Sequence, residues 1–533
     1  MNKKYLILLV ALQVFSMSAI AKAETATKPF EKNRYLIRRD FEMNDYAKNA
    51  DYTLINWIKG NVSSETGLPF SFQIPLEEKE EVYGRMGGQN SVEGIIERVI
   101  VEEGLVIYDG AVRQIVLSML GGEENLKEAF RPVEVYWNGS LNDISNLRAG
   151  FPINNFIYDI NDPYAVSSDL SEKGKRGFIF RIINANGRYA TVDPYDGKSE
   201  FEGFPAWPAI HWEDWKPVAG ENAWIAMSAL HLYHKKYFNS QTQEYSHPQE
   251  SVELSLAKEL ARAAILLQAG NGGIRMAPIG TYMQGHQDGK GWYNLISTEN
   301  NLSWYAAFRM LYQITNDSQY KEAMDKMDHY FQLAWNQSGQ YFYQGMSFKK
   351  GEWSLEKKHF ATDVQTWGIM VLGCQKIDQW FGEGASYRAW QAAKNFAGSL
   401  GENGSLLGVG FAEENDRVSA EWTAGAIFAA RMIAEYYKYA NFEWSMRSFV
   451  DAQQMREGIE LLRKEAGVNK QAYSYSSKRG WIPFGWFSHE PSVLSLASTA
   501  WMVLLDAEFN PFDLPGMNQD KARWELAEVE ITN

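Results

Sequence analysis

The sequence predicts an all-α fold, an (α/α)6 toroid of six helical hairpins with a small β-containing insertion. Apolar helices rich in Ala, Ser and Gly alternate along the chain with more polar, amphipathic helices. The apolar helices are hydrophobic around much of their circumference and must be buried on most sides, whereas each polar helix has one apolar stripe. An inner ring of helices enclosed by an outer ring satisfies both patterns.

The elements follow this alternation in order. Six apolar segments are expected to form the inner ring: 106–122, 219–237, 297–314, 360–377, 418–437 and 488–509. The more polar segments that follow the first five are 123–132, 250–268, 318–336, 386–400 and 449–465, and an N-terminal helix over 45–60 is the expected outer partner of the sixth. Each inner and outer pair makes one helical hairpin. The longest insertion, 137–218, contains two alternating runs around Asn-Ala-Asn-Gly that predict strands.

The N-terminus predicts export. Lys3 and Lys4 precede an apolar run, and Ala21 and Ala23 form a small-x-small site, so cleavage is expected after Ala23. The predicted organisation is a signal peptide over 1–23, one catalytic domain over 24–510 with its rim insertion at 137–218, and a C-terminal tail over 511–533. No later segment has 18 consecutive apolar residues, so we expect a periplasmic or secreted protein without stable membrane insertion.

Charge and composition restrict the substrate. The net charge of −14 becomes −17 without residues 1–23, which contain three Lys and no acid (49 minus 66). This acidic balance disfavours nucleic acid and polyanionic ligands and suits a neutral substrate. Aromatic residues make up 14% of the chain, and their rings can stack on flat apolar ligand faces such as those of sugars. The single cysteine, Cys374, cannot form an internal disulfide, and its apolar surroundings predict burial.

An acidic residue stands at or near the start of every predicted inner helix: Asp109, Glu221, Glu299, Asp363, Glu421 and Glu490. In a toroid of antiparallel hairpins all inner-helix N-termini point to one rim, so these carboxylates are expected to surround one funnel. Acids are also favoured in the first turn of any helix, because they satisfy free N–H groups and the helix dipole. Capping alone therefore explains many such acids.

Three of the acids are redundant as caps. Ser297 or Thr298 can cap the helix beside Glu299, Thr362 can do so beside Asp363, and Ser419 beside Glu421. Glycosidic cleavage needs paired carboxyl groups, one to protonate the leaving oxygen and one to activate water or attack the anomeric carbon. We therefore expect Glu299 and Asp363 to be the catalytic pair, with Glu421 as the next candidate. Sugar contacts are expected from the remaining rim acids and from the polar and aromatic neighbours Asn300, Trp304, Trp367, Trp422 and His489.

The chain resembles the six-hairpin, (α/α)6-toroid glycosidases over nearly all of its expected mature length. The resemblance lies in the alternating hairpins and in the segments SSETGLPFSF (63–72), VIYDGAV (106–112), STENNLSWYAAF (297–308) and FATDVQTWG (360–368). Those enzymes cleave polysaccharides or oligosaccharides with a Glu/Asp pair at the funnel. The resemblance thus implies hydrolysis or transglycosylation of glycosidic bonds, without a cofactor or metal, and it does not specify the linkage or the oligomeric state.

Two other function classes remain open. A polysaccharide lyase would use Tyr or His to remove a proton from an acidic sugar. The candidates for that role are His211, His286, His489, Tyr282 and Tyr293. A glycan-binding or envelope-assembly protein would keep the toroid without catalysis. That class is favoured if the rim acids are ion-paired to Arg275, Arg309 or Arg431. His231 and His234 lie on one helix without an obvious third metal ligand.

Overall fold

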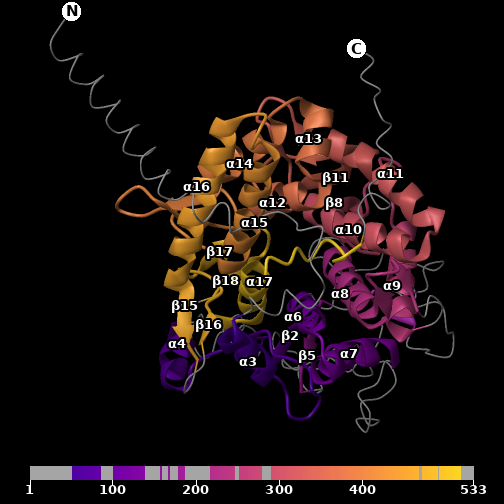
Figure 1. The fold of residues 1–533 in the computed structure, drawn as a ribbon, viewed down its shortest axis with the longest axis vertical. Helices are drawn as coiled ribbons and strands as arrows, with labels where there is room; N and C mark the ends of the chain where they lie inside the picture. The colour runs from indigo at the N-terminus through magenta and orange to yellow at the C-terminus, as the bar shows by residue number, and fades with distance from the viewer. Residues whose placement is uncertain are drawn as a thin grey trace, which may run out of the picture.

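The computed structural model describes residues 51–85, 100–138, 157–158, 166–167, 178–179, 181–186, 217–246, 251–278, 290–466, 471–489 and 491–517. Six inner helices form a closed ring, since each packs on the next and the last packs on the first. In ring order they are α6 (Ile107–Leu120), α8 (Ala219–Tyr237), α10 (Thr298–Thr315), α12 (Thr362–Leu372), α15 (Ala420–Tyr436) and α17 (Leu496–Asp506). The predicted (α/α)6 toroid is confirmed, and Figure 1 views it down the ring.

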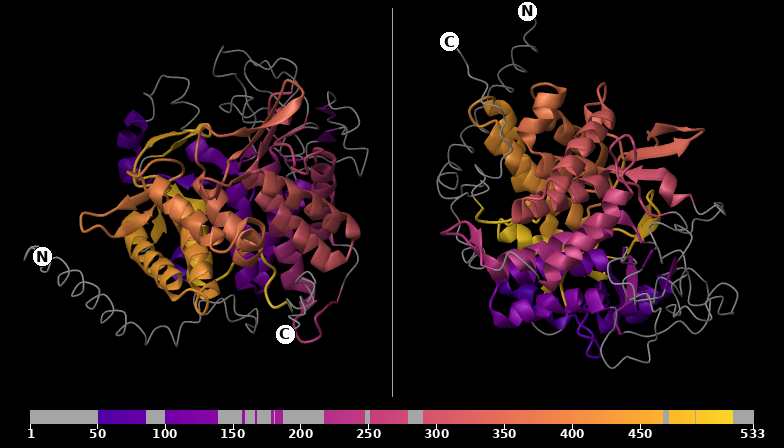
Figure 2. Two further views of the ribbon diagram at one scale, coloured as in Figure 1. Left: turned by 90° about the horizontal axis from the view of Figure 1, so that it is seen from above. Right: turned by 90° about the vertical axis from the view of Figure 1, so that its right-hand side faces the viewer.

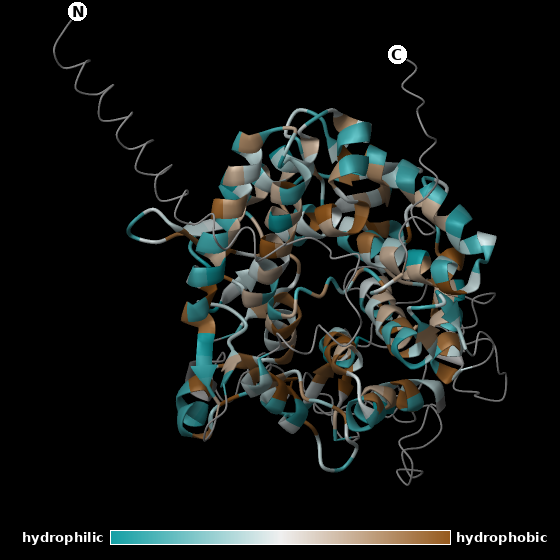
Figure 3. Cartoon of the chain, in the orientation of Figure 1, coloured by the Kyte–Doolittle hydropathy of each residue, from teal (hydrophilic) through white to brown (hydrophobic). Residues whose placement is uncertain are grey.

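The outer helices pack against their inner partners as the alternation predicts. They are α7 (Glu123–Asn138), α9 (Val252–Leu266), α11 (Ser318–Leu333), α14 (Ala385–Ala397), α16 (Phe442–Gly458) and α3 (Tyr52–Gly60), and α3 covers α17, which follows it by more than 400 residues. Hydrophilic residues gather on the outward sides of the outer helices (Figure 3). No helix in the described part of the chain has the length and hydropathy needed to span a membrane.

Local chemistry moves several helix ends from their predicted positions. Helix α12 stops at Leu372 because Gly373 takes a φ of 82°, and a short helix, α13 (Cys374–Phe381), follows with Cys374 buried. Helix α10 ends at Thr315, and its C-cap, Asn316, takes the left-handed conformation that Asn tolerates. Helix α7 continues through Pro132 to Asn138, six residues beyond its predicted end.

Short strands occupy the connections between the helices. Those nearest the inner-helix N-termini are β2 (Gly104–Val106) with β5 (Ile182–Asn184), the three-stranded sheet of β8 (Leu295–Ser297), β11 (Gly345–Lys349) and β12 (Glu352–Glu356), the hairpin β17 (Gly480–Ile482) with β18 (Trp486–Ser488), and β1 (Phe72–Gln73) with β19 (Leu494–Ser495). Strand β5 belongs to the predicted β-containing insertion, and the second predicted run after it lies outside the described residues.

The remaining strands form smaller hairpins. They are β3 (Ile157–Tyr158) with β4 (Val166–Ser167), β6 (Phe238–Asn239) with β7 (Glu244–Tyr245), β9 (Trp335–Asn336) with β10 (Tyr341–Phe342), β13 (Gly398–Leu400) with β14 (Leu406–Val409), and β15 (Arg463–Glu465) with β16 (Gln471–Tyr473). A short helix, α4 (Lys79–Arg85), follows β1 in the chain. All described pairings are antiparallel.

The sixth inner helix is shorter than predicted. The expected helix over 488–509 begins only at Leu496, because residues 486–488 pair within the β17–β18 hairpin and 494–495 pair with β1. His489 therefore precedes the helix by several residues instead of opening it, and Glu490 lies outside the described residues.

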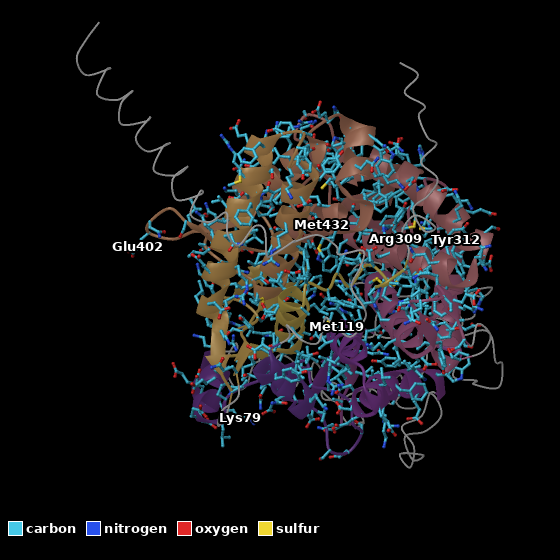
Figure 4. The ribbon with its side chains drawn as sticks, in the orientation of Figure 1. Lys79, Met119, Arg309, Tyr312, Glu402 and Met432 are labelled. Carbon is cyan, nitrogen blue, oxygen red and sulfur yellow. The ribbon has the colours of Figure 1, made fainter. Side chains whose placement is uncertain are left out.

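The chain after α17 crosses the ring from the far end of that helix toward α8 and α10 (Figure 1). His231 and His234 of α8 hydrogen-bond to the carbonyls of Pro511 and Pro515, at 2.8 Å each. Arg309, labelled in Figure 4, donates to the Phe512 carbonyl and to Asp513. Phe512 is fully buried and packs against Trp224 and Trp367. The segment thus enters the ring from the C-terminal ends of its helices, and Phe512 reaches the interior beside Trp224 and Trp367.

Candidate active site

Five of the six inner helices place an acidic residue in their first turn. Asp109 comes from α6, Glu221 from α8, Glu299 from α10, Asp363 from α12 and Glu421 from α15, whereas α17 has none. The acids are close enough to repel one another electrostatically: Glu299 senses Asp363, Glu221 and Glu421, and Glu421 also senses Asp109. The structure therefore gathers these five predicted residues at one end of the ring.

Glu299 and Glu421 are not needed as helix caps, because a serine caps each of their helices. Ser297 caps α10 by accepting from the Asn300 N–H, and Ser419 caps α15 by accepting from the Trp422 N–H. The third predicted cap is wrong: Thr362 is the first residue of α12, and its hydroxyl finds no hydrogen-bond partner among the described residues. Asp363 instead accepts from the N–H of Val364 at 2.8 Å.

Glu299 and Asp363 form a pair of carboxyl groups that no cation of the described residues neutralises. Burial raises the pKa of Asp363 from 3.8 to about 7. Burial first, and then repulsion by Asp363, raise the pKa of Glu299 well above its usual 4.5. Glu299 still keeps some exposed surface, so the dense protein around it desolvates the carboxyl without closing it off. At neutral pH this pair holds a proton that two isolated carboxyl groups would release.

Polar neighbours orient the Glu299 side chain. Ser303, one turn further along α10, donates to Glu299 Oε1 at 3.1 Å. When the Asn300 amide is turned so that its nitrogen donates to Glu299 Oε2, its oxygen accepts from the N–H of Gly220 at 3.3 Å. A side chain on Gly220 would collide with this amide. Asn300, predicted as a sugar contact, is therefore engaged in positioning Glu299.

Glu421 is held more tightly than the other two catalytic candidates. The Tyr108 hydroxyl donates to Glu421 Oε1 and accepts from the Trp501 indole N–H at 2.7 Å. Burial raises the pKa of Glu421 well above its usual value, and the bond from Tyr108 lowers it. Tyr108 precedes Asp109 in α6 and was not among the predicted site residues. The chain Trp501–Tyr108–Glu421 fixes this carboxylate in one place.

Asp109 and Glu221 form the side of the site that carries a positive charge. The Arg181 guanidinium lies 3.3 Å from Glu221 Oε1. Burial raises the pKa of Asp109 to about 7, a bond from Ser71 lowers it, and Glu221 raises it further. Arg181 immediately precedes β5, which pairs with the strand that leads into α6. The insertion thus brings a cation to the acids, and sequence reasoning did not find it.

The three tryptophans that the sequence predicts as sugar contacts are all buried in the structure. Trp304 is fully buried, and its indole N–H donates to the Ala219 carbonyl at 2.8 Å, so the prediction that it contacts sugar is wrong. Trp367 is only 3% exposed and stacks with Trp501 within the ring, one turn below Asp363. Trp422 packs edge-on against Phe411, and its indole N–H faces Asp363 without reaching hydrogen-bond geometry.

His489 lies near the acids although it does not open a helix. Its ring packs against Phe72 at 4.5 Å and against Tyr475 at 5.8 Å, and Tyr475 senses the charges of Glu421 and Asp109. Tyr475 is a second residue that the sequence did not reveal, because it comes from a loop between β16 and β17. His211, His286 and Tyr282, considered for a lyase, lie outside the described residues.

The described residues contain no group of His, Cys, Asp and Glu arranged to hold a metal ion. His231 and His234 lie at the other end of α8 and bind backbone carbonyls, as given above. Arg275 and Arg309 are also engaged elsewhere: Arg275 donates to the Tyr293 carbonyl, and Arg309 binds the C-terminal segment. Neither neutralises the catalytic candidates.

Comparisons with known proteins agree on the fold. A sugar epimerase from a ruminal bacterium matches with a TM-score of 0.51 at 12% identity, covering 87% of this chain and 98% of that one. Cellobiose 2-epimerase from Bacillus thermoamylovorans matches with a TM-score of 0.52 at 10% identity, covering 87% and 98%. A D-mannose isomerase matches at 0.50 and 9% identity, covering 88% and 99%. No protein-family model matches the chain, and a comparison with curated protein sequences finds no match.

Proposed function

We propose that this protein is a carbohydrate-active enzyme that hydrolyses, or transglycosylates, glycosidic bonds of a neutral polysaccharide or oligosaccharide. The observation that supports this most strongly is the Glu299–Asp363 pair, two carboxyl groups of raised pKa at one end of the ring. Within the described residues, neither these two groups nor Glu421 forms an ion pair with Lys, Arg or His. A structural acid in such surroundings would gain from a counter-ion, so its absence favours chemistry.

The pair divides the work of glycosidic cleavage by protonation state. Glu299 keeps its proton and donates it to the departing glycosidic oxygen. Asp363 takes a proton from water as the water attacks the anomeric carbon, or Asp363 attacks that carbon itself and is later released by water. Either route ends with one water consumed and one reducing end formed. Glu421, held in place by Tyr108, lies beside this pair and supplies a polar group at the site.

A second candidate is a sugar epimerase or isomerase, which the names of the similar solved structures favour. Such a reaction needs a base that removes a proton next to a sugar carbonyl and an acid that returns it. Asp363, with its pKa near 7, could remove the proton and Glu299 could return it. This reaction leaves the mass and the glycosidic bonds of the sugar unchanged, so the products separate it from hydrolysis.

The test is product analysis on a panel of neutral and acidic glycans and of free disaccharides, with Glu299→Gln and Asp363→Asn beside the parent. Glu443→Gln is the matched control, because Glu443 is an exposed first-turn acid of outer helix α16. Hydrolysis predicts new reducing ends with the parent and the control, and none with the two site variants. A sugar of unchanged mass but altered configuration would select the epimerase instead.

Two further outcomes would reject both enzymes. An unsaturated, ultraviolet-absorbing product from acidic glycans would identify a lyase. Glycan binding without turnover, unchanged in Glu299→Gln, would identify a binding or envelope-assembly protein. We also propose export to the periplasm or beyond, and detection of mature protein beginning at Glu24 in that compartment would test the predicted cleavage after Ala23.

A further inference from the structure

Two β hairpins stand beside the candidate catalytic acids. The first, residues 345–356, contains β11 and β12 and pairs with β8, whose last residue, Ser297, caps α10 two residues before Glu299. The second, residues 480–488, contains β17 and β18. The loop before it forms a bridge between Ser476 and Ser419, the cap of α15 two residues before Glu421. We call these the first and second aromatic hairpins.

Each hairpin presents an aromatic cross-strand pair to solvent. Phe348 pairs with Trp353 in the first hairpin, with ring centroids 5.2 Å apart, and Trp481 pairs with Phe487 in the second, at 5.0 Å. Phe348 is 36% exposed, Trp481 55% and Phe487 39%. Paired large rings stabilise a hairpin, but leaving their faces in water forfeits the gain of burial. Exposed apolar groups gathered in this way mark a binding surface.

An arginine lies on a ring of each pair. In the first hairpin the Arg275 guanidinium lies 5.0 Å from the Trp353 ring and 4.0 Å from the Tyr293 ring, and it donates to the Tyr293 carbonyl at 2.9 Å. No carboxylate of the described chain forms an ion pair with it. In the second hairpin Arg479 lies 4.7 Å from the Phe487 ring. Guanidinium donors that lie over one ring thus stand beside exposed aromatic surface, and the two together match the peripheral hydroxyls and the apolar face of a sugar ring.

The hairpins occupy different sides of the acidic centre. The first adjoins the start of α10, and the second leads toward the start of α17, which lies three places further round a closed ring of six. Both hairpins project from the same end of the ring, as the two views of Figure 2 show. The second hairpin is linked to the acids through Tyr475 and His489, which flank it and contact each other, and Tyr475 senses the charge of Glu421.

We propose that the two aromatic hairpins bind separate sugar units of one neutral glycan chain, on opposite sides of the bond held at Glu299 and Asp363. This inference rests on the proposed function and sharpens it. A substrate that reaches both hairpins is an oligosaccharide or polysaccharide bound along its length, not a free monosaccharide or disaccharide. Each hairpin adds binding energy remote from the reacting bond, so longer chains bind more tightly.

The test uses affinity gel electrophoresis in gels containing dextran, mannan, xylan or β-glucan, with every variant made in the Glu299→Gln background. Trp481→Ala alters the second hairpin and Phe348→Ala the first. Tyr439→Ala is the matched control, because Tyr439 is 91% exposed and follows the C-terminal end of α15, away from the acids. Thermal unfolding of each variant checks that the fold is intact.

We expect at least one polysaccharide to retard the Glu299→Gln protein. Each hairpin variant should then bind about fivefold to tenfold more weakly, and Tyr439→Ala should bind as its parent does. Equal retardation of all variants would overturn the proposal, and so would retardation by none of the four polysaccharides. A change in sedimentation of the hairpin variants without a change in retardation would assign the rings to self-association and would also overturn it.

A parallel activity measurement separates this inference from the proposed function. In the catalytically intact background, Trp481→Ala and Phe348→Ala should raise KM for hexasaccharides several times more than KM for the shortest substrate. Hydrolysis that is insensitive to both variants at every chain length would reject the hairpin sites while the glycosidase stands. Retardation that depends on the hairpins, without hydrolysis by any form, would reject the glycosidase instead.

Discussion

The two ends of the toroid treat buried charge in opposite ways. At the C-terminal ends of the inner helices, Arg309 is paired with Asp513, and His231 and His234 are bonded to backbone carbonyls. At the N-terminal ends, Glu299 and Asp363 lie close enough to repel each other, and within the described part of the chain neither forms an ion pair with Lys, Arg or His. Both ends are densely packed, so burial alone does not distinguish them. The buried charges at the C-terminal ends thus have partners, whereas at the N-terminal ends Arg181 pairs only with Glu221 and the Glu299–Asp363 pair keeps raised pKa values. Under the proposed function, the reaction uses these raised pKa values.

The largest effect is expected at the acidic end. Glu299→Gln keeps the shape and the hydrogen-bonding reach of the side chain but removes its transferable proton, so turnover should fall by about 10²–10⁴-fold. Stability should stay constant or rise, because a buried acid is replaced by a neutral amide. Initial rates of reducing-end release and thermal unfolding check both halves. Comparable loss in Glu443→Gln would show that the effect is not specific to the site.

At the C-terminal ends of the inner helices, a substitution should lower stability and leave activity unchanged. Phe512→Ala deletes a fully buried ring that packs on Trp224 and Trp367, and it should lower the free energy of unfolding by about 3–5 kcal/mol. Activity per folded molecule should remain at the parent level well below the melting temperature. Urea unfolding together with rate measurements tests this, and a loss of activity without a loss of stability would contradict the division between the ends.

The pH dependence of stability should differ in sign between the ends. Asp109 and Asp363 have pKa values raised from 3.8 to about 7, so the folded state retains protons that the unfolded chain releases. The stability that these two carboxyl groups contribute is fully present below about pH 4. It is lost as pH rises toward 7, by up to about 4 kcal/mol per group. Asp109→Asn should reduce this alkaline loss in urea unfolding at pH 5 and pH 8.

His231 and His234 give stability the opposite dependence on pH. The pKa of His231 is lowered from 6.5 to about 4 and that of His234 to about 3, because burial disfavours their charged forms. Below about pH 6.5 these histidines bind protons in the unfolded chain but not in the folded chain, so the free energy of unfolding falls as pH drops. His234→Gln should flatten this acid limb and leave the alkaline limb unchanged. An effect on the alkaline limb instead would refute the assignment.

The smallest effect is expected from Tyr108→Phe, which removes the donor that holds Glu421. Loss of a hydrogen bond to a buried carboxylate should cost about 1–3 kcal/mol of stability. The pKa of Glu421 should rise further, so the pH–rate profile should shift while turnover falls less than in Glu299→Gln. Unchanged stability and an unchanged profile would show that the Tyr108 bond does not position this group.

The sequence predicted the ring and five of its acids because both depend on local patterns. Helical periodicity identified each inner and outer helix, and the first-turn position placed Asp109, Glu221, Glu299, Asp363 and Glu421 on one rim. Periodicity did not reveal where a helix gives way to strand pairing, since that depends on partners distant in sequence. The sixth inner helix was therefore predicted to start at 488, before the pairing of Ser495 with Phe72 ends.

The errors in the site have similar causes. Trp304 follows Glu299 by five residues, which places it about 140° around the helix and directs it into the core. Trp367 follows Asp363 by four residues and so points into the ring. Arg181 and Tyr475 come from connections whose positions only the folded chain defines. Tyr108 lies next to Asp109, but nothing in its neighbourhood signals a bond to Glu421, 313 residues later.

The central claim is that Glu299 holds a proton at neutral pH beside Asp363, a pair that no cation of the described residues neutralises. Infrared difference spectroscopy of the parent protein against Glu299→Gln at pH 7 tests it most directly. The account predicts that the substitution removes a protonated-carboxyl band, which Glu443→Gln retains. Loss of an ionised-carboxylate band in its place would contradict the account, because Glu299 could then not donate a proton to a glycosidic oxygen.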